Sequence, residues 1–223
     1  MILKLKNDVL VKYKGIDSHV EIPQGVKVIG ELAFKSCTFL KSLIICEGVT
    51  EIERGAFWDC AYLESVTLPK SVRILRDKVF TFCTDLQSIN LSESVEAIGK
   101  YAFSHCYSLQ SINIPDSIRE IENGAFGYCR SLKSIRFPRN VEVIGELAFY
   151  ECESLESIKL PRSVREIRNS AFYGCSSLKS VNIPKGGKDI GDSAFLYCDS
   201  LKSLEIPDEG LQYLPDKDLE KQV

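Results

Sequence analysis

A 23-residue unit repeats without insertion or deletion through most of this 223-residue chain. Its clearest copy, LQSINIPDSIREIENGAFGYCRS, spans residues 109–131. One phenylalanine and one cysteine return at every step: Phe34, Phe57, Phe80, Phe103, Phe126, Phe149, Phe172 and Phe195, and Cys37, Cys60, Cys83, Cys106, Cys129, Cys152, Cys175 and Cys198. A fixed period of about 20 to 50 residues indicates a solenoid of stacked coils. The chain is therefore expected to form one elongated array.

Each unit opens with a six-residue segment that alternates in polarity. In the unit that starts at Leu109, Ile112 and Ile114 are expected to point inward, and Ser111 and Asn113 outward. The β-branched residues favour a strand. A proline then ends the strand, because it lacks the N–H that would extend the ladder. The Ala–Phe pair of each unit is predicted to stack from coil to coil as an aromatic core.

The two ends of the chain depart from the repeat. Apolar runs on either side of Asn7-Asp8 predict a β-hairpin cap over residues 1–16. The repeat array is expected over residues 17–210, in about eight units. Residues 211–223 are interpreted as a degenerate C-terminal cap and polar tail, since terminal units of a solenoid must differ from internal ones.

The eight periodic cysteines occupy one equivalent place per coil and should all point the same way. Adjacent coils lie about 4.8 Å apart at strand spacing, but parallel side chains do not bring the two Cβ atoms together as a disulfide requires. We therefore interpret them as buried free thiols, with disulfides as the alternative. Cysteine pairs at metal-ligand spacing are not found in the sequence, so no metal site is expected.

Sequence motifs for catalysis are not found: there is no G-x-S-x-G, H-E-x-x-H, G-x-G-x-x-G or phosphate loop. The only histidines, His19 and His105, are interpreted as solvated polar residues. No enzyme, cofactor or metal is expected. The net charge of −3 argues against specific nucleic-acid binding, and the apolar stretches are too short to insert into a membrane. The N-terminal sequence lacks a signal-peptide pattern, which points to the cytoplasm.

The repeat resembles the BspA-like, treponemal-type leucine-rich repeats, most plainly in LKSIRFPRNVEVIGELAFYEC over residues 132–152. The resemblance covers roughly residues 17–210. It implies an α/β leucine-rich-repeat solenoid with a curved parallel sheet on the concave face and irregular or 3₁₀ structure on the convex side. It also implies a bacterial adhesion or interaction module, placed at the cell surface or secreted.

Two outward columns of the predicted sheet are candidates for ligand binding. One is serine in all eight units, which concave crowding and bonding between coils would also explain. The next column varies, as a recognition surface would and as neutral drift would. Its central members are the candidate ligand-binding residues Asn90, Asn113, Arg136, Lys159 and Asn182.

Charge is uneven along the array. Residues 130–188 carry 11 basic and 6 acidic side chains, a net charge of +5, while the remainder carries −8. A basic segment could attract an acidic partner. The alternative is ordinary solvated and paired surface charge.

Aromatic side chains also gather next to the periodic phenylalanines. They either cover the edge of the core or form an interface, where tyrosine and tryptophan are common anchors. The secondary candidate site consists of Trp58, Tyr128, Tyr150, Tyr173 and Tyr197, with Phe82 beside them.

The sequence favours a non-enzymatic module that binds an unidentified protein or glycan through the sheet. The alternatives are a structural or self-associating scaffold and an accessory repeat domain of a larger protein. A monomer is expected, with self-association through the aromatic edge or end to end as the alternative.

Overall fold

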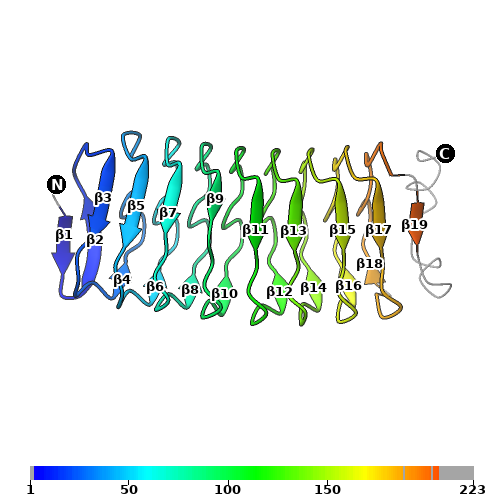
Figure 1. Cartoon of the computed structure of the whole chain (residues 1–223), viewed down its shortest axis with the longest axis horizontal. Coiled ribbons are helices and arrows are strands. Elements are labelled where there is room, and N and C mark those ends of the chain that lie inside the picture. Colours follow the sequence, from blue (N-terminus) through cyan, green and yellow to red (C-terminus); the bar gives the residue numbers. More distant parts are fainter. Residues whose placement is uncertain (1–2, 188, 202, 206–223) are drawn as a thin grey trace.

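The computed structural model describes residues 3–187, 189–201 and 203–205, the last three as backbone only. They form a parallel β-solenoid of about eight turns in which each coil contributes one strand of two to four residues and a second strand of two residues (Figure 1). The first strands of the coils form the serine-strand ladder: β3 (His19–Ile22), β5 (Ser42–Ile45), β7 (Ser65–Thr67), β9 (Ser88–Ile89), β11 (Ser111–Asn113), β13 (Ser134–Arg136), β15 (Ser157–Lys159), β17 (Ser180–Asn182) and β19 (Ser203–Glu205). The others form the short-strand ladder: β4 (Val28–Ile29), β6 (Glu51–Ile52), β8 (Ile74–Leu75), β10 (Ala97–Ile98), β12 (Glu120–Ile121), β14 (Val143–Ile144), β16 (Glu166–Ile167) and β18 (Asp189–Ile190).

Both ladders pair in register at the 23-residue step. Ser111 lies opposite Ser134, and Ser157 lies opposite Ser180. Each ladder is divided once into two sheets: the serine-strand ladder between β13 and β15, and the short-strand ladder between β10 and β12. The register explains why one residue type can form a column along the whole array.

The N-terminal hairpin expected around Asn7-Asp8 is present. Strand β1 (Leu3–Lys6) pairs antiparallel with β2 (Val9–Tyr13), and β2 then pairs parallel with β4 as the first member of the short-strand ladder. The ring of Tyr13 stacks on Phe34 with centroids 4.9 Å apart. The hairpin therefore covers the end of the solenoid and supplies the aromatic ring that a preceding coil would have contributed. The expected C-terminal cap, residues 211–223, lies outside the described residues.

The periodic phenylalanines form one buried stack through the array. All eight are at most 2% exposed, and neighbouring ring centroids lie 5.0 to 5.5 Å apart. The residue before each phenylalanine, Val79 in the third coil and alanine in the others, is buried as well. This confirms the predicted aromatic core, whose stability comes from contacts between coils.

The periodic cysteines form a second buried column, and all nine cysteines are free thiols. Seven are buried, and each directs its Sγ at the carbonyl oxygen of a phenylalanine in the preceding coil, 3.0 to 3.3 Å away. Burial raises the pKa of the Cys83 and Cys129 thiols. The prediction of burial does not hold for Cys37, which is only half-buried in the first coil.

The segment around each Ala–Phe pair is a run of turns instead of a helix. Two residues per coil have positive φ, one two residues before the phenylalanine and one two residues after it: Leu32, Gly55, Lys78, Tyr101, Gly124, Leu147, Ser170 and Ser193, and Ser36, Asp59, Phe82, His105, Tyr128, Glu151, Gly174 and Tyr197. A left-handed residue ends a right-handed helix. The α/β class and the 3₁₀ segments implied by the family resemblance are therefore not confirmed: helix is absent from the part of the chain that the structure describes.

The alternating backbone of these turns builds a further hydrogen-bond ladder between coils. In the fifth coil the N–H of Ala125 donates to Glu122 in the same coil at 3.1 Å, whereas the N–H of Phe126 donates to Ala148 in the next coil at 2.9 Å. Gly124 and Tyr128 also donate to the next coil. Every second N–H thus connects coils, so the turns add to the stacking that the two strand ladders provide.

Candidate functional site

The five candidate binding residues lie in one exposed column at the ends of the serine strands. Asn113 lies opposite Arg136 in one sheet, and Lys159 lies opposite Asn182 in the other. Asn90 directly follows β9. All five are exposed. The structure therefore brings them together as predicted on one face, but the column crosses the division between β13 and β15.

The serine column beside it is exposed from Ser65 to Ser180 and half-buried at Ser42. His19 continues this column at the N-terminal end, where its Nδ1 lies 2.6 Å from Ser42 Oγ. Because serine side chains are short, the taller residues of the variable column stand above them. A ligand on this face would meet the variable residues first.

The basic residues of this face differ in whether a carboxylate neutralises them. Arg139 donates to Asp116 through its backbone N–H at 2.8 Å and its Nε at 2.7 Å. These bonds, with the charge of Arg136 3.9 Å away, lower the pKa of Asp116. In contrast, Lys159, Arg162 and Lys185 have no ion pair with any of the described residues.

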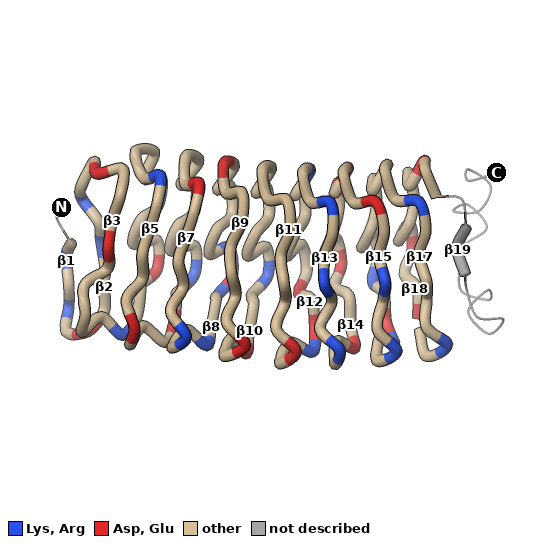
Figure 2. Tube along the Cα trace, viewed as in Figure 1, with Lys and Arg blue, Asp and Glu red and all other residues tan. Residues whose placement is uncertain are grey.

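A cavity of about 550 Å³ lies between the coils that carry Lys159 and Asn182. Its polar lining consists of these two side chains with Arg162 and Lys185, and its floor contains the buried Ile183. A second cavity of about 530 Å³ adjoins it and shares Arg162 and Gly186. Figure 2 shows the charges along the array, with Lys and Arg following one another at the turns below β13, β15 and β17. We call the first cavity the basic pocket.

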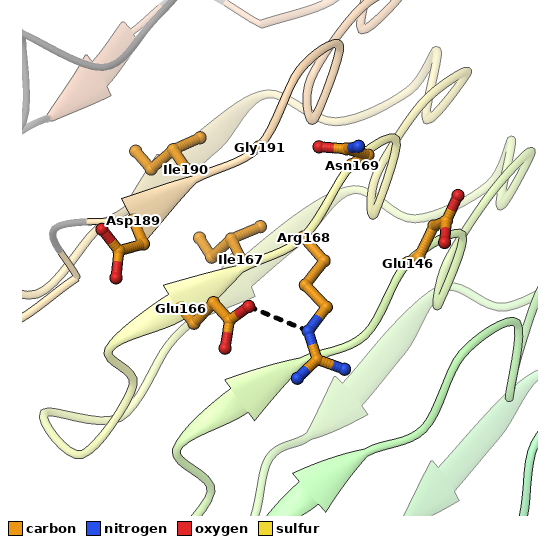
Figure 3. A pocket seen from close by; sticks show the side chains of 8 residues that line it. All are labelled: Glu146, Glu166, Ile167, Arg168, Asn169, Asp189, Ile190 and Gly191. Carbon is orange, nitrogen blue, oxygen red and sulfur yellow. Dashed lines mark hydrogen bonds and ion pairs between the residues drawn. The ribbon is translucent and has the colours of Figure 1, made fainter.

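The pockets of the short-strand ladder have a different chemistry. The cavity in Figure 3, about 380 Å³, is lined by Glu146, Glu166 and Asp189 and by one cation, Arg168. That cation is already neutralised, since its Nε lies 2.9 Å from Glu166 and its Nη1 lies 2.8 Å from Glu120. A similar cavity near the N-terminus, about 420 Å³, contains the Arg76–Glu51 ion pair at 2.6 Å. The arginines of both cavities are thus paired and carboxylates are in excess in their linings, whereas the cations of the basic pocket have no ion pair with a described residue.

The predicted aromatic edge is a continuous row of rings. Phe82, Tyr128, Tyr150, Tyr173 and Tyr197 belong to it, with neighbouring centroids 4.8 to 5.2 Å apart from Tyr128 onward. Trp58 is not in this row. Its ring lies 4.5 Å from Lys35 Nζ, and its buried Nε1 has no hydrogen-bond partner within the described part of the chain.

His105 completes the aromatic row, and the interpretation of this residue as solvated is wrong. Its ring lies 4.3 Å from Phe82 and 4.4 Å from Tyr128, and its Nδ1 lies 2.8 Å from Ser104 Oγ. Burial, together with the charge of Arg130, lowers the pKa of His105. The signal that could have placed it is its position two residues after Phe103, where the neighbouring coils carry Phe82 and Tyr128.

The described residues contain no group of three or more His, Cys, Asp or Glu side chains arranged to hold a metal ion. They also include no helix long and apolar enough to cross a membrane. The described surface offers an exposed polar column, a basic pocket whose cations have no ion pair and a row of aromatic rings in contact.

Comparison with known families decides what kind of repeat this is. The BspA type leucine rich repeat region, in six copies, matches residues 12–132 and 96–220. The chain belongs to the BspA-type leucine-rich repeat family. No catalytic family is indicated, and leucine-rich repeat solenoids generally serve as binding scaffolds. The resemblance stated from residues 132–152 is thereby confirmed.

Solved structures of other proteins share the fold. A leucine-rich repeat protein from Bacteroides ovatus is 30% identical with a TM-score of 0.69, and the match covers 90% of this chain and 60% of that one. The leucine-rich repeat protein of T. pallidum, TpLRR, is 26% identical with a TM-score of 0.64, covering 99% and 92%. The pneumococcal vaccine antigen PcpA, 19% identical with a TM-score of 0.59, covers 92% and 67% and shows the fold alone. No curated protein matches this BspA-type chain.

Proposed function

We propose that this chain is a non-enzymatic binding module that recognises a protein or a glycan through the face of the serine-strand ladder. The observation that supports this most is the exposed variable column of Asn90, Asn113, Arg136, Lys159 and Asn182, which stands above a column of serines. At strand spacing the five positions extend over about 20 Å. That length suits a sugar chain or a protein loop.

The charge of the column sets the kind of ligand. Lys159 has no carboxylate partner among the described residues, and the Asp116 carboxylate nearest Arg136 lies 3.9 Å away and is also held by Arg139. A neutral to acidic ligand would therefore gain from both cations. Its affinity should fall as salt is added, because exposed charges are screened over about 10 Å at 0.1 M ionic strength.

The test is a charge reversal at the column. The Arg136→Glu/Lys159→Glu variant and wild type would be compared on a printed glycan array and a panel of immobilised proteins. Binding should weaken by about tenfold or more, which corresponds to about 1.4 kcal/mol. Both side chains are exposed, so the melting temperature should stay nearly constant. The control variant Lys70→Glu/Arg73→Glu carries the same change in net charge in another part of the array.

The second candidate function is self-association through the aromatic row. The observation that favours it is the row of six aromatic rings from Phe82 to Tyr197, in which each ring contacts the next. Light scattering of wild type and of a Tyr150→Ala/Tyr173→Ala variant would test it. If those changes abolish ligand binding while the reversals at Arg136 and Lys159 do nothing, the recognition surface is the aromatic row.

We propose a cell-surface or secreted location, on the basis of the family resemblance. Protease treatment of intact host cells should then degrade the protein. Retention in the cytoplasmic fraction would contradict this. The chain covers 60% of its Bacteroides ovatus relative, which keeps the role of an accessory repeat domain in a larger protein as an alternative.

A further inference from the structure

The basic pocket differs from the rest of the array because its charges are not compensated. In the described coils, the residue after the strand-ending proline lies at the same place in the turn, and these residues form the turn column. Cys46 and Ser92 replace the proline in two of the coils. Glu47 accepts the backbone N–H of Lys70 at 2.9 Å, and Asp116 neutralises Arg139. The next two members, Arg162 and Lys185, have no carboxylate partner among the described residues.

Strand geometry places these two cations next to the candidate column. Lys159 and Asn182 are paired in register on β15 and β17. Arg162 lies three residues after Lys159, and Lys185 lies three residues after Asn182 in the next coil. All four side chains line the same cavity of about 550 Å³. Adjacent coils are separated by about 4.8 Å. Three cations and one amide thus converge on a single cavity, and none of the described residues in its lining is acidic.

The remaining lining of the pocket is apolar and fixed. Leu160, Ile183 and Pro184 are buried residues whose surfaces form its floor. The turn below them is closed by the hydrogen bond from Gly187 N–H to the Pro184 carbonyl, 2.8 Å long. An apolar floor with a few convergent polar groups is the usual composition of a ligand site, and such sites measure about 300 to 1,000 Å³.

We propose that the basic pocket binds an acidic sugar unit of a glycan, one that carries a carboxylate or a sulfate. The guanidinium of Arg162 suits two oxygens of such a group, and the ammonium groups of Lys159 and Lys185 add charge. The Asn182 amide can donate to and accept from ring hydroxyls, and the apolar floor faces the C–H surface of the ring. The volume holds a whole sugar ring, which is more than a lone anion would need.

The adjoining cavity extends the site along the turn. It shares Arg162 with the basic pocket and adds Arg165, and its one carboxylate is Asp189. The two cavities together present four cations and one carboxylate. A glycan with several acidic units in sequence would therefore bind more tightly than a single acidic sugar.

This inference rests on the proposed function and names the ligand class of the same face. Its test is calorimetry on the full chain with four probes: a sulfated heparin tetrasaccharide, a galacturonic acid trisaccharide, a neutral galactose trisaccharide and hexaglutamate. At least one acidic oligosaccharide should bind, and which one binds tells sulfate from carboxylate. The neutral sugar and the peptide should bind at least about tenfold more weakly, and affinity should fall with added salt.

Variants separate the pocket from the rest of the face. Arg162→Glu/Lys185→Glu should lower the affinity for the acidic oligosaccharide by about tenfold or more, since charge-assisted bonds are lost. The control Lys70→Glu/Arg73→Glu makes the same change in net charge about four to five coils away and should change the affinity less than about twofold. Circular dichroism would check that both variants are folded.

Several results would overturn the inference. Equal binding of hexaglutamate and the acidic sugars would make the site a general polyanion surface. Loss of binding in Arg136→Glu but not in Arg162→Glu/Lys185→Glu would leave the proposed function standing and exclude the pocket. Failure of every acidic sugar to bind wild type would also refute the inference.

Discussion

Truncation of one phenylalanine in the middle of the aromatic stack should divide the array into two parts. Phe126 is fully buried between Phe103 and Phe149, with ring centroids 5.5 and 5.4 Å away. Replacing a buried phenylalanine by alanine costs about 3–5 kcal/mol. We expect the upper end of that range for Phe126→Ala, about 5 kcal/mol, because the ring stacks on both sides and each pair adds roughly 0.5–1.5 kcal/mol beyond area burial.

Coil stability is coupled to the nearest neighbours, so a defect at Phe126 weakens two interfaces at once. Trp58, the only tryptophan, reports on the second coil and lies on the N-terminal side of the defect. In urea, fluorescence and far-UV circular dichroism should give one common transition for wild type. In Phe126→Ala they should separate, since dichroism also follows the C-terminal coils.

The matched control for this experiment is Phe39→Ala. Phe39 is 60% exposed and lies outside the stack, so its truncation should cost less than about 0.5 kcal/mol and leave the two probes coincident. If Phe126→Ala costs no more than Phe39→Ala, the aromatic stack is not what couples the coils. If it costs about 5 kcal/mol but the probes stay coincident, cooperativity extends beyond nearest neighbours and that part of the reasoning fails.

Three further predictions concern single sites. Because the pKa of His105 is lowered in the folded protein, the free energy of unfolding should fall as pH drops from about 6.5 through that lower value. Denaturation series at different pH should show that His105→Phe removes this pH-dependent part of the stability, and an unchanged pH profile in the variant would contradict the prediction. A hydrogen bond with the thiol of Cys60 in the next coil lowers the pKa of Cys37, whereas desolvation raises the pKa of Cys46. In a thiol titration of the native protein, Cys37 should therefore react first, Cys46 more slowly and the seven buried thiols only after denaturation. Ser170 has a left-handed backbone with a φ of 53°, which glycine adopts more readily than serine. Ser170→Gly should therefore raise the free energy of unfolding by about 0.5–1 kcal/mol, and a loss of stability would show that the left-handed turn is not strained.

The sequence predicted those features that one residue type fills in every coil. Phe126 and Cys129 recur at a fixed step, and a solenoid must place equivalent residues in one column, so the aromatic stack and the thiol column follow from the period alone. The hairpin at Asn7-Asp8 followed from its own local pattern. The turns around the phenylalanine did not, because φ is positive at places filled by residues as different as Leu147 and Gly124. Residue identity therefore carried no signal of the left-handed backbone that replaces the expected 3₁₀ segments.

The aromatic row shows a second limit of reading one coil at a time. The row uses the place directly after the phenylalanine in Tyr150 and Tyr173, and the following place in Phe82, Tyr128 and Tyr197. Since the two places converge in space, a strict column does not describe the row. His105 was assigned by its own polarity, whereas its surroundings are set by the rings of the coils on either side.

The net charge of a sequence segment is a poor guide to where a charged binding site lies. The excess of +5 over residues 130–188 does not say which cations are free. In the structure Arg130 lies 3.1 Å from Glu153, Lys179 lies 2.7 Å from Glu156, and Arg168 is held by two glutamates. Exposed pairs of this kind contribute little to stability, but they cancel the local field. Carboxylates thus neutralise Arg130, Lys179 and Arg168. Lys159, Arg162 and Lys185 have no ion pair with a described residue, and they line one cavity. The proposed binding site therefore depends on which coils lack a carboxylate in the turn column, and this is a property of neighbouring coils that no single repeat contains.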